Sequence, residues 1–102
     1  MKKEQKQVDE WVKQYKIGYF SPFECLACLT EEMGEVAKEI NHLYGPKKKK
    51  KSEGIGNLGD EIADVIVALC CLANSQNIDL DKHFQKVMDK YHYRDNNRWE
   101  KK

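Results

Sequence analysis

The chain has 102 residues, of which 40% are hydrophobic and 34% are charged. This length predicts a single domain over residues 1–102 that can build a core of several helices, and the composition is that of a globular protein with a polar surface. The formal net charge of +1 excludes a global attraction to nucleic acid or to an anionic membrane, so we expect no stable nucleic-acid binding.

Four helices are predicted from the apolar spacing and from the residues that start and stop helices. The first ends before Gly18. The second has the clearest limits, because Ser21 is a good N-cap with Glu24 three residues later and Gly45 is a good stop. The third starts near Asn57, another favoured N-cap. No alternating strand pattern competes, so we predict an all-α fold. The expected helices are about residues 3–16, 22–44, 57–75 and, from Asp79 or Asp81, to about Tyr91, with a linker at 46–56 that includes the lysine run Lys47–Lys51.

The sequence favours a reducing compartment. No signal-peptide pattern precedes the four cysteines, since residues 1–6 are hydrophilic. The apolar run at 62–73 is too short, and too interrupted by Asp64, to span a bilayer. We therefore expect a cytoplasmic protein with reduced thiols and no membrane association.

Asp64 is the most informative residue, because it is the only charge in the run 62–73. A helix that is apolar nearly all round is expected inside a fold. A carboxylate buried with it must find a cation or several donors, or lose its charge. Asp64 is therefore predicted to be buried and to need a partner.

Other carboxylates are predicted to meet Asp64. Glu32 and Glu35 lie on the second helix beside its apolar seam, and Glu61 lies one turn before Asp64 on the third. If these helices pack antiparallel, four oxygen ligands converge, which suits Mg²⁺ or Mn²⁺. Four carboxylates suggest two or more ions, the arrangement that holds phosphoryl oxygens during displacement. The competing interpretation is a solvated acidic face, with Asp64 paired to one lysine.

The two acidic clusters resemble the signature of the MazG-type nucleotide pyrophosphohydrolases, the all-α NTP pyrophosphatase superfamily. That signature is Glu-Glu-x-x-Glu followed by Glu-x-x-Asp, found here at 31–35 and 61–64. The similarity covers about residues 8–99. It implies a four-helix MazG-like bundle assembled as an oligomer, and Mg²⁺-dependent hydrolysis of (deoxy)nucleoside triphosphates to the monophosphate and pyrophosphate, as nucleotide-pool housekeeping.

The resemblance also implies roles for single residues. The metal ligands would be Glu32, Glu35, Glu61 and Asp64, and Glu31 would orient or deprotonate the attacking water. The basic residues Lys90, Arg94 and Arg98, which continue an i, i+4 ladder from Lys82 and Lys86, would contact the substrate phosphates, although such a ladder is also typical of a solvated helix face. From their chemistry alone, Trp11 and Tyr15 are candidates to stack on the base, although aromatic residues at helical spacing more often form a core.

Three other functions remain open. The cysteines at 25, 28, 70 and 71 offer a zinc site, although adjacent cysteines on a helix point about 100° apart. Glu39 and His42 form a Glu-x-x-His motif, as in a di-iron bundle, but the second motif that this needs is only approximated at 89–92. The third alternative is a non-catalytic interaction module. A long apolar stripe on so short a chain predicts a homodimer or homotetramer.

Overall fold

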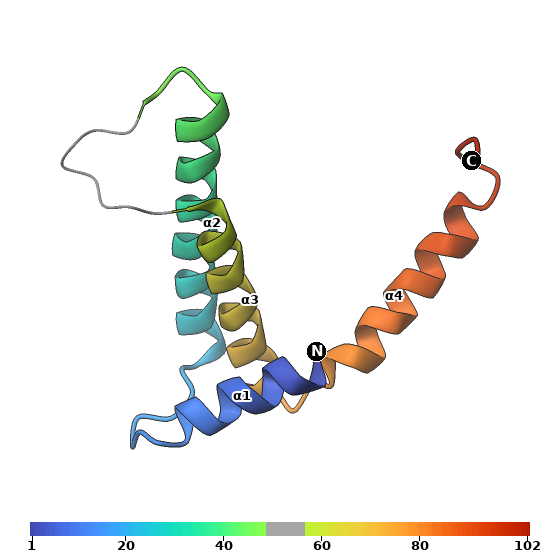
Figure 1. Cartoon of the computed structure of the whole chain (residues 1–102). Helices are drawn as coiled ribbons and strands as arrows, with labels where there is room; N and C mark the ends of the chain where they lie inside the picture. The colour runs from blue at the N-terminus through green and yellow to red at the C-terminus, as the bar shows by residue number, and fades with distance from the viewer. Residues whose placement is uncertain (49–56) are drawn as a thin grey trace.

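The computed structural model describes residues 1–48 and 57–102, and over these residues the chain is helical and contains no strand (Figure 1). The helices are α1 (Lys2–Val12), α2 (Pro22–Tyr44), α3 (Leu58–Ser75) and α4 (Leu80–Asp95). The all-α prediction is therefore confirmed. Most of the lysine-rich linker, including the end of the run Lys47–Lys51, lies outside the described residues.

The helices start where the capping residues predict. The Ser21 hydroxyl accepts the Glu24 backbone N–H at 3.3 Å, and the Glu24 carboxylate accepts the Ser21 N–H at 3.1 Å, which completes a capping box. The Asn57 side chain accepts the Asp60 N–H at 2.7 Å. Each cap satisfies a backbone donor that the first helical turn leaves without a partner.

Two helix ends differ from the prediction by about four residues. α1 stops at Val12, because the Tyr15 N–H bonds to the Val12 carbonyl at 3.1 Å and tightens the chain into turns. Gly18, at a φ of +63°, then reverses the chain, and the Tyr19 hydroxyl donates back to Asp9 at 2.6 Å. At the other end of the chain α4 continues to Asp95, because nothing after Tyr91 ends a helix.

The body of the molecule is formed by three helices. α2 and α3 lie antiparallel and side by side, and α1 crosses the C-terminal end of α3 (Figure 1). Val8 and Val12 of α1 pack against Cys70, which is fully buried. This core joins α1 to α3 and is small. α2 is held mainly by its contact with α3 along the length of the two helices.

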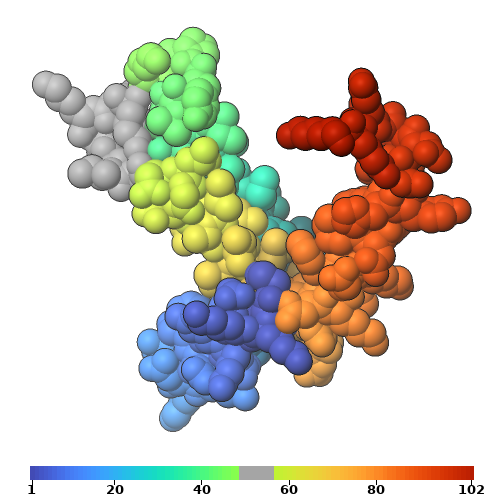
Figure 2. Space-filling view, turned by 45° about the vertical axis from the view of Figure 1, so that its right-hand side comes forward, coloured from blue at the N-terminus to red at the C-terminus, as the bar shows by residue number. Residues whose placement is uncertain are grey.

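α4 projects from this body and touches it only near its own first turn (Figure 2). Gln5 of α1 organises the junction: its amide nitrogen donates to Asn74 at 2.9 Å and to the Ile78 carbonyl at 2.8 Å, and its amide oxygen accepts the Leu80 N–H at 2.9 Å. The terminal amino group of Met1 also pairs with the carboxylate of Asp81. Polar contacts at one end therefore set the direction of α4.

The chain exposes much more surface than a compact protein of its size. Its accessible surface is 8606 Å², whereas a compact monomer of this mass is expected to expose about 6,000 Å². Its radius of gyration is 17.2 Å, against about 13 Å expected for a compact chain of this length. Within one chain α1, α2 and α4 leave much of α3 uncovered.

The prediction that α3 is buried is therefore wrong for the single chain. Ile62, Ile66 and Leu69, which share one face at helical spacing, are 46%, 39% and 41% exposed. No helix in the described part of the chain is long and apolar enough to cross a membrane.

Candidate functional site

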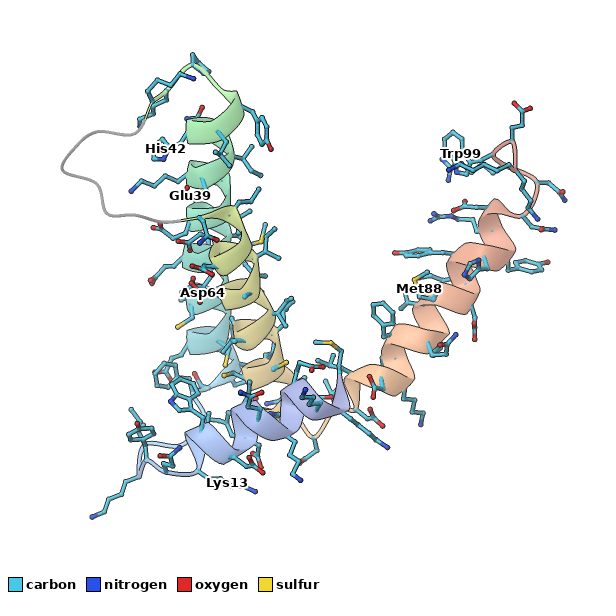
Figure 3. The ribbon with its side chains drawn as sticks, viewed as in Figure 1. Lys13, Glu39, His42, Asp64, Met88 and Trp99 are labelled. Atoms are coloured by element: carbon cyan, nitrogen blue, oxygen red, sulfur yellow. The ribbon has the colours of Figure 1, made fainter. Side chains whose placement is uncertain are left out.

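Three carboxylates converge where α2 and α3 pack together. One carboxylate oxygen from each of Glu32, Glu61 and Asp64 lies within 4.8 Å of the other two. Glu32 comes from the middle of α2 and the other two come from the first turns of α3, so the antiparallel packing brings them together (Figure 3). This part of the prediction agrees with the geometry.

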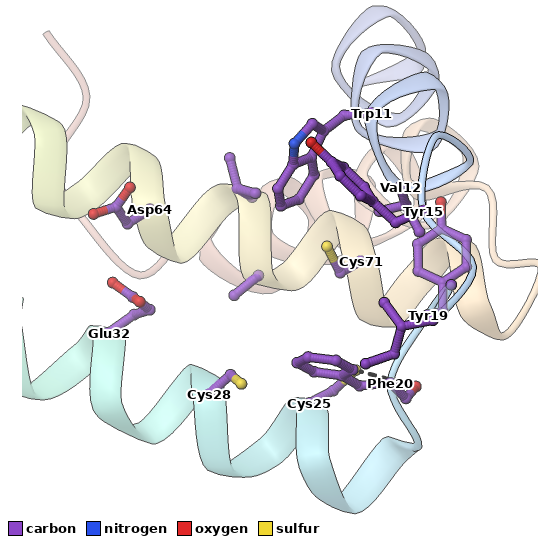
Figure 4. Close-up of a pocket in the computed structure, with 14 residues that line it drawn as sticks. Trp11, Val12, Tyr15, Tyr19, Phe20, Cys25, Cys28, Glu32, Asp64 and Cys71 are labelled. Atoms are coloured by element: carbon purple, nitrogen blue, oxygen red, sulfur yellow. Dashed lines mark hydrogen bonds between the residues drawn. The ribbon is translucent and has the colours of Figure 1, made fainter.

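Asp64 is exposed, not buried as the apolar run predicted. The error has the same physical cause as the exposure of Ile62 and Ile66: the surface of α3 that carries them has no cover within this chain. Asp64 still faces Glu32 across the helix pair (Figure 4). Over residues 1–48 and 57–102, no lysine or arginine forms an ion pair with either carboxylate or with Glu61.

The carboxylates of the cluster repel one another, and no cation in the described part of the chain balances their negative charge. The pKa of the Glu61 carboxyl is raised above its usual range, first by loss of hydration and then by neighbouring carboxylates, of which Asp64 and Glu35 act most strongly. Removing the charge of Glu61 by protonation, or balancing it with a cation, would relieve this repulsion. The site therefore favours positive charge.

Glu31 and Glu35 lie outside the group of three. Both are exposed, and neither places an oxygen within the 4.8 Å group, although the charge of Glu35 is felt at Glu61. Further along α2, Glu39 and His42 are 6% and 8% exposed, with Oε1 and Nδ1 3.9 Å apart (Figure 3). They form a buried polar pair behind the cluster.

A cavity of about 340 Å³ opens beside the carboxylates. Trp11 and Tyr15, the predicted base-stacking residues, line it together with Glu32 and Asp64 (Figure 4). The two aromatic rings meet edge to face with centroids 6.4 Å apart. Both are about half exposed, so neither belongs to a packed core. Trp11 lies on the last turn of α1 and Tyr15 lies in the turns that follow it.

The basic residues do not reach the carboxylates of their own chain. Lys90, Arg94 and Arg98 lie on α4 and just beyond it, on the arm that points away from α2 and α3 (Figure 3). Arg94 donates to both oxygens of Asp95, at 2.9 and 3.0 Å, and its guanidinium lies 4.6 Å from the Tyr91 ring centroid. Within one chain these side chains lie away from the acidic cluster (Figure 1), and their contact with the substrate phosphates stays a prediction.

The alternative metal sites find less support. In the described part of the chain, Glu32, Glu61 and Asp64 are the group whose donor atoms come within range of one ion, and the cysteines form no such group. The Glu39–His42 pair lies on α2, whereas residues 89–92, the approximate second motif, lie on the distant α4 (Figure 1). A thiolate zinc site and a di-iron site are both disfavoured.

Sequence reasoning missed one wall of the cavity. Cys25, Cys28 and Cys71 line it, together with Val67 and Ala68. The prediction from the sequence names these cysteines as candidate zinc ligands and not as the lining of a cavity. The available signal was their register: Cys25, Cys28 and Glu32 follow one another at i, i+3 and i+7 on a single face of α2.

The chain is similar to proteins of one family. Residues 20–99 match the model of the MazG nucleotide pyrophosphohydrolase domain. YpjD of Bacillus subtilis (strain 168), a protein of uncharacterised function, is 48% identical over 102 residues, which is 100% of this chain and 92% of YpjD.

Solved structures show the same similarity. The crystal structure of YpjD from Bacillus subtilis superposes with a TM-score of 0.79, covering 88% of this chain and 92% of that one. A Bacillus-conserved MazG protein, described as a nucleotide pyrophosphohydrolase, is 44% identical and superposes with a TM-score of 0.75, covering 88% of this chain and 86% of that one.

Proposed function

Because the chain belongs to the MazG nucleotide pyrophosphohydrolase family, we propose that it hydrolyses (deoxy)nucleoside triphosphates to the nucleoside monophosphate and pyrophosphate. The observation that carries this proposal is the convergence of Glu32, Glu61 and Asp64, which have no cationic partner among residues 1–48 and 57–102, at the edge of a cavity lined by Trp11 and Tyr15. The role would be housekeeping of the nucleotide pool in the cytoplasm.

Mg²⁺ is the cofactor that fits the donor set, with Mn²⁺ as a substitute. Carboxylate oxygens without sulfur or imidazole suit a hard cation, and loss of hydration together with the neighbouring carboxylates raises the pKa of Glu61, a repulsion that a bound cation would relieve. Glu32, Glu61 and Asp64 would hold the metal, with Glu35 completing the set for a second ion. Bound there, Mg²⁺ would lower the pKa of water and neutralise charge on phosphoryl oxygens.

The chain's own residues supply the rest of the mechanism. Trp11 and Tyr15 would stack on the base and so place the α-phosphate beside Glu32 and Asp64, which line the same cavity. Glu31 precedes Glu32 on α2 and is exposed, so its carboxylate is available to orient the attacking water and to take its proton.

We also propose that the active unit is a homodimer or homotetramer in which α4 serves the site of another copy. The chain exposes about 2,600 Å² more than a compact monomer of its mass, which is at least as much as the roughly 1,000 to 2,500 Å² that each partner buries in an obligate interface. No lysine or arginine in the described part of the chain pairs with the acidic cluster, and α4, which carries Lys90 and Arg94 with Arg98 just beyond its end, points away from it (Figure 1). Complementary charge supports contact between α4 of one copy and the carboxylates of another.

Pyrophosphate release from a panel of NTPs and dNTPs with Mg²⁺ tests the activity. We expect hydrolysis by the wild type, and a loss of roughly 100-fold or more in kcat/KM for Glu61→Gln and Asp64→Asn, as for other groups that stabilise transition-state charge. Glu10→Gln is the matched control, because Glu10 is an exposed glutamate on α1 and should retain full activity. Equal rates for Asp64→Asn and wild type would contradict the proposed mechanism.

A further inference from the structure

Three cysteines form one wall of the cavity beside the carboxylates, together with Val67 and Ala68, and this surface is the sulfur wall. Cys25 and Cys28 reach it from α2 and Cys71 reaches it from α3 (Figure 4). The neighbouring Cys70 faces the other way, where it is fully buried against Val8 and Val12. Three of the four cysteines therefore border the cavity, although the proposed hydrolysis gives them no role in the chemical step.

These thiols differ in how they meet the cavity. Cys25 is 4% exposed, and its thiol donates to the Phe20 carbonyl at 3.7 Å. Cys28 and Cys71 are half-buried and open onto the space. Burial raises the pKa of Cys71, so it stays a protonated, weakly polar group near neutral pH. Cys28 and Cys71 are thus the two sulfur atoms that a bound molecule would touch.

The wall offers shape but few hydrogen bonds. Val67 and Ala68 have no polar side-chain atoms, and thiols are weak donors and acceptors. The nearby Tyr19 hydroxyl already donates to Asp9 and accepts from Asn74 at 3.0 Å. The other polar side chains that line the cavity, Trp11, Tyr15 and the two carboxylates, lie away from this wall, so a base that contacts Cys28 and Cys71 meets an apolar surface there (Figure 4).

The position of the wall relates it to the reacting end of the substrate. Cys28 is four residues before Glu32, one turn away on the same face of α2. The volume of about 340 Å³ is near the lower end of small-ligand sites, which run from about 300 to 1,000 Å³. When a phosphate lies at the carboxylates, a base of limited size fits between the sulfur wall and Trp11.

We infer that Cys28 and Cys71 are specificity-determining residues, which select the base of the nucleotide by size and apolar contact rather than by hydrogen bonds. This inference rests on the proposed function. It assigns the thiols no part in the chemical step, so changes to them should alter the ratio of kcat/KM between purine and pyrimidine triphosphates. A single methylene in an apolar pocket changes such discrimination by about 10- to 200-fold.

The first test measures that ratio for variants of known size. We expect Cys28→Ala to raise the purine-to-pyrimidine ratio about tenfold and Cys28→Met to lower it by a similar factor, with Cys71→Ala acting in the direction of Cys28→Ala. Cys70→Ala is the matched control, since Cys70 lies outside this cavity; it should leave the ratio unchanged even where it lowers stability. Unchanged ratios in all variants at positions 28 and 71 would overturn the inference.

The second test does not need catalysis. A nucleoside monophosphate should slow the reaction of Cys28 with N-ethylmaleimide at least tenfold, measured by peptide mass spectrometry in the wild-type protein, while the buried Cys70 stays unlabelled. Protection without pyrophosphate release from any nucleotide would overturn the proposed hydrolysis but support the sulfur wall. Hydrolysis without protection would overturn the wall, and the absence of both would overturn both.

Discussion

The α2–α3 pair and α4 carry opposite charge and have opposite surroundings. In the pair, three carboxylates meet in a packed seam without a described cation. α4 has few contacts with the rest of the chain. Its basic side chains Arg94 and Arg98 pair with Asp95, and Arg94 also lies over the Tyr91 ring. One chain therefore carries an acidic region on α2 and α3 and a basic region on α4, and no ion pair joins the two regions in the described part of the chain. Each region gains a partner if it meets the other region of a second copy.

The largest expected effect comes from mixing two inactive variants. Glu61→Gln and Arg94→Ala should each lose activity, yet equal amounts allowed to exchange subunits should recover about a quarter of the wild-type rate, because half of the dimers are mixed and each mixed dimer has one intact site. Pyrophosphate release measures the recovery.

Mixing Glu61→Gln with Asp64→Asn is the control, since both changes affect the cluster of a single chain and no site is restored. If subunit exchange is verified by mass spectrometry and the first mixture stays inactive, α4 does not act on another copy.

A smaller effect is expected from charging the apolar stripe of α4. Phe84 is 62% exposed and begins a stripe that continues through Val87, Met88 and Tyr91. Phe84→Glu should shift the protein toward the monomer in sedimentation analysis, because the interface would have to bury a charge. Tyr93→Glu adds the same charge on the opposite side of the helix and should leave the oligomer intact. If both variants stayed assembled, the apolar stripe of α4 would not lie in the interface between copies.

The smallest effect concerns stability. The folded-state pKa of Glu61 is raised, so its protonated form favours folding below the ordinary glutamate pKa, and this contribution is lost as pH rises through the folded pKa. At pH 7 without divalent ions, Glu61→Gln should therefore have a higher Tm than wild type. The difference should shrink near pH 4 and on addition of Mg²⁺, which balances the charge. Glu10→Gln, which removes an exposed carboxylate of α1 outside the cluster, is the control variant, and the same Tm for Glu61→Gln and wild type under all conditions would contradict the argument.

Local signals in the sequence predicted the helices well, because caps act within a few residues. Ser21, Glu24 and Asn57 form the bonds that their spacing indicates. The end of α1 was wrong by four residues because it depends on a distant contact: the Tyr19 hydroxyl reaches Asp9 only once the chain has turned at Gly18. Such a contact has no signature in a helical pattern.

The candidate site was predicted in part for a similar reason. Helical register and antiparallel packing were enough to bring Glu32 to Glu61 and Asp64. The exposure of Asp64 in the single chain was not predicted, because an apolar run indicates a surface that needs cover but not whether the same chain supplies it. The sulfur wall was missed because cysteine is a common small core residue.

The junction at Gln5 makes α4 a lever. From Leu80 to Asp95 the helix is about 24 Å long at 1.5 Å per residue, so a tilt of about 10° at its base displaces its far end by about 4 Å. The Gln5 amide, through its bonds to Asn74, Ile78 and Leu80, thus helps to set where Arg94 points, together with the pair between the Met1 amino group and Asp81. Gln5 therefore matters for the orientation of α4. A small change of angle at the Gln5 junction would move Arg94 out of reach of its proposed partner, even when the lost hydrogen bonds contribute little to stability.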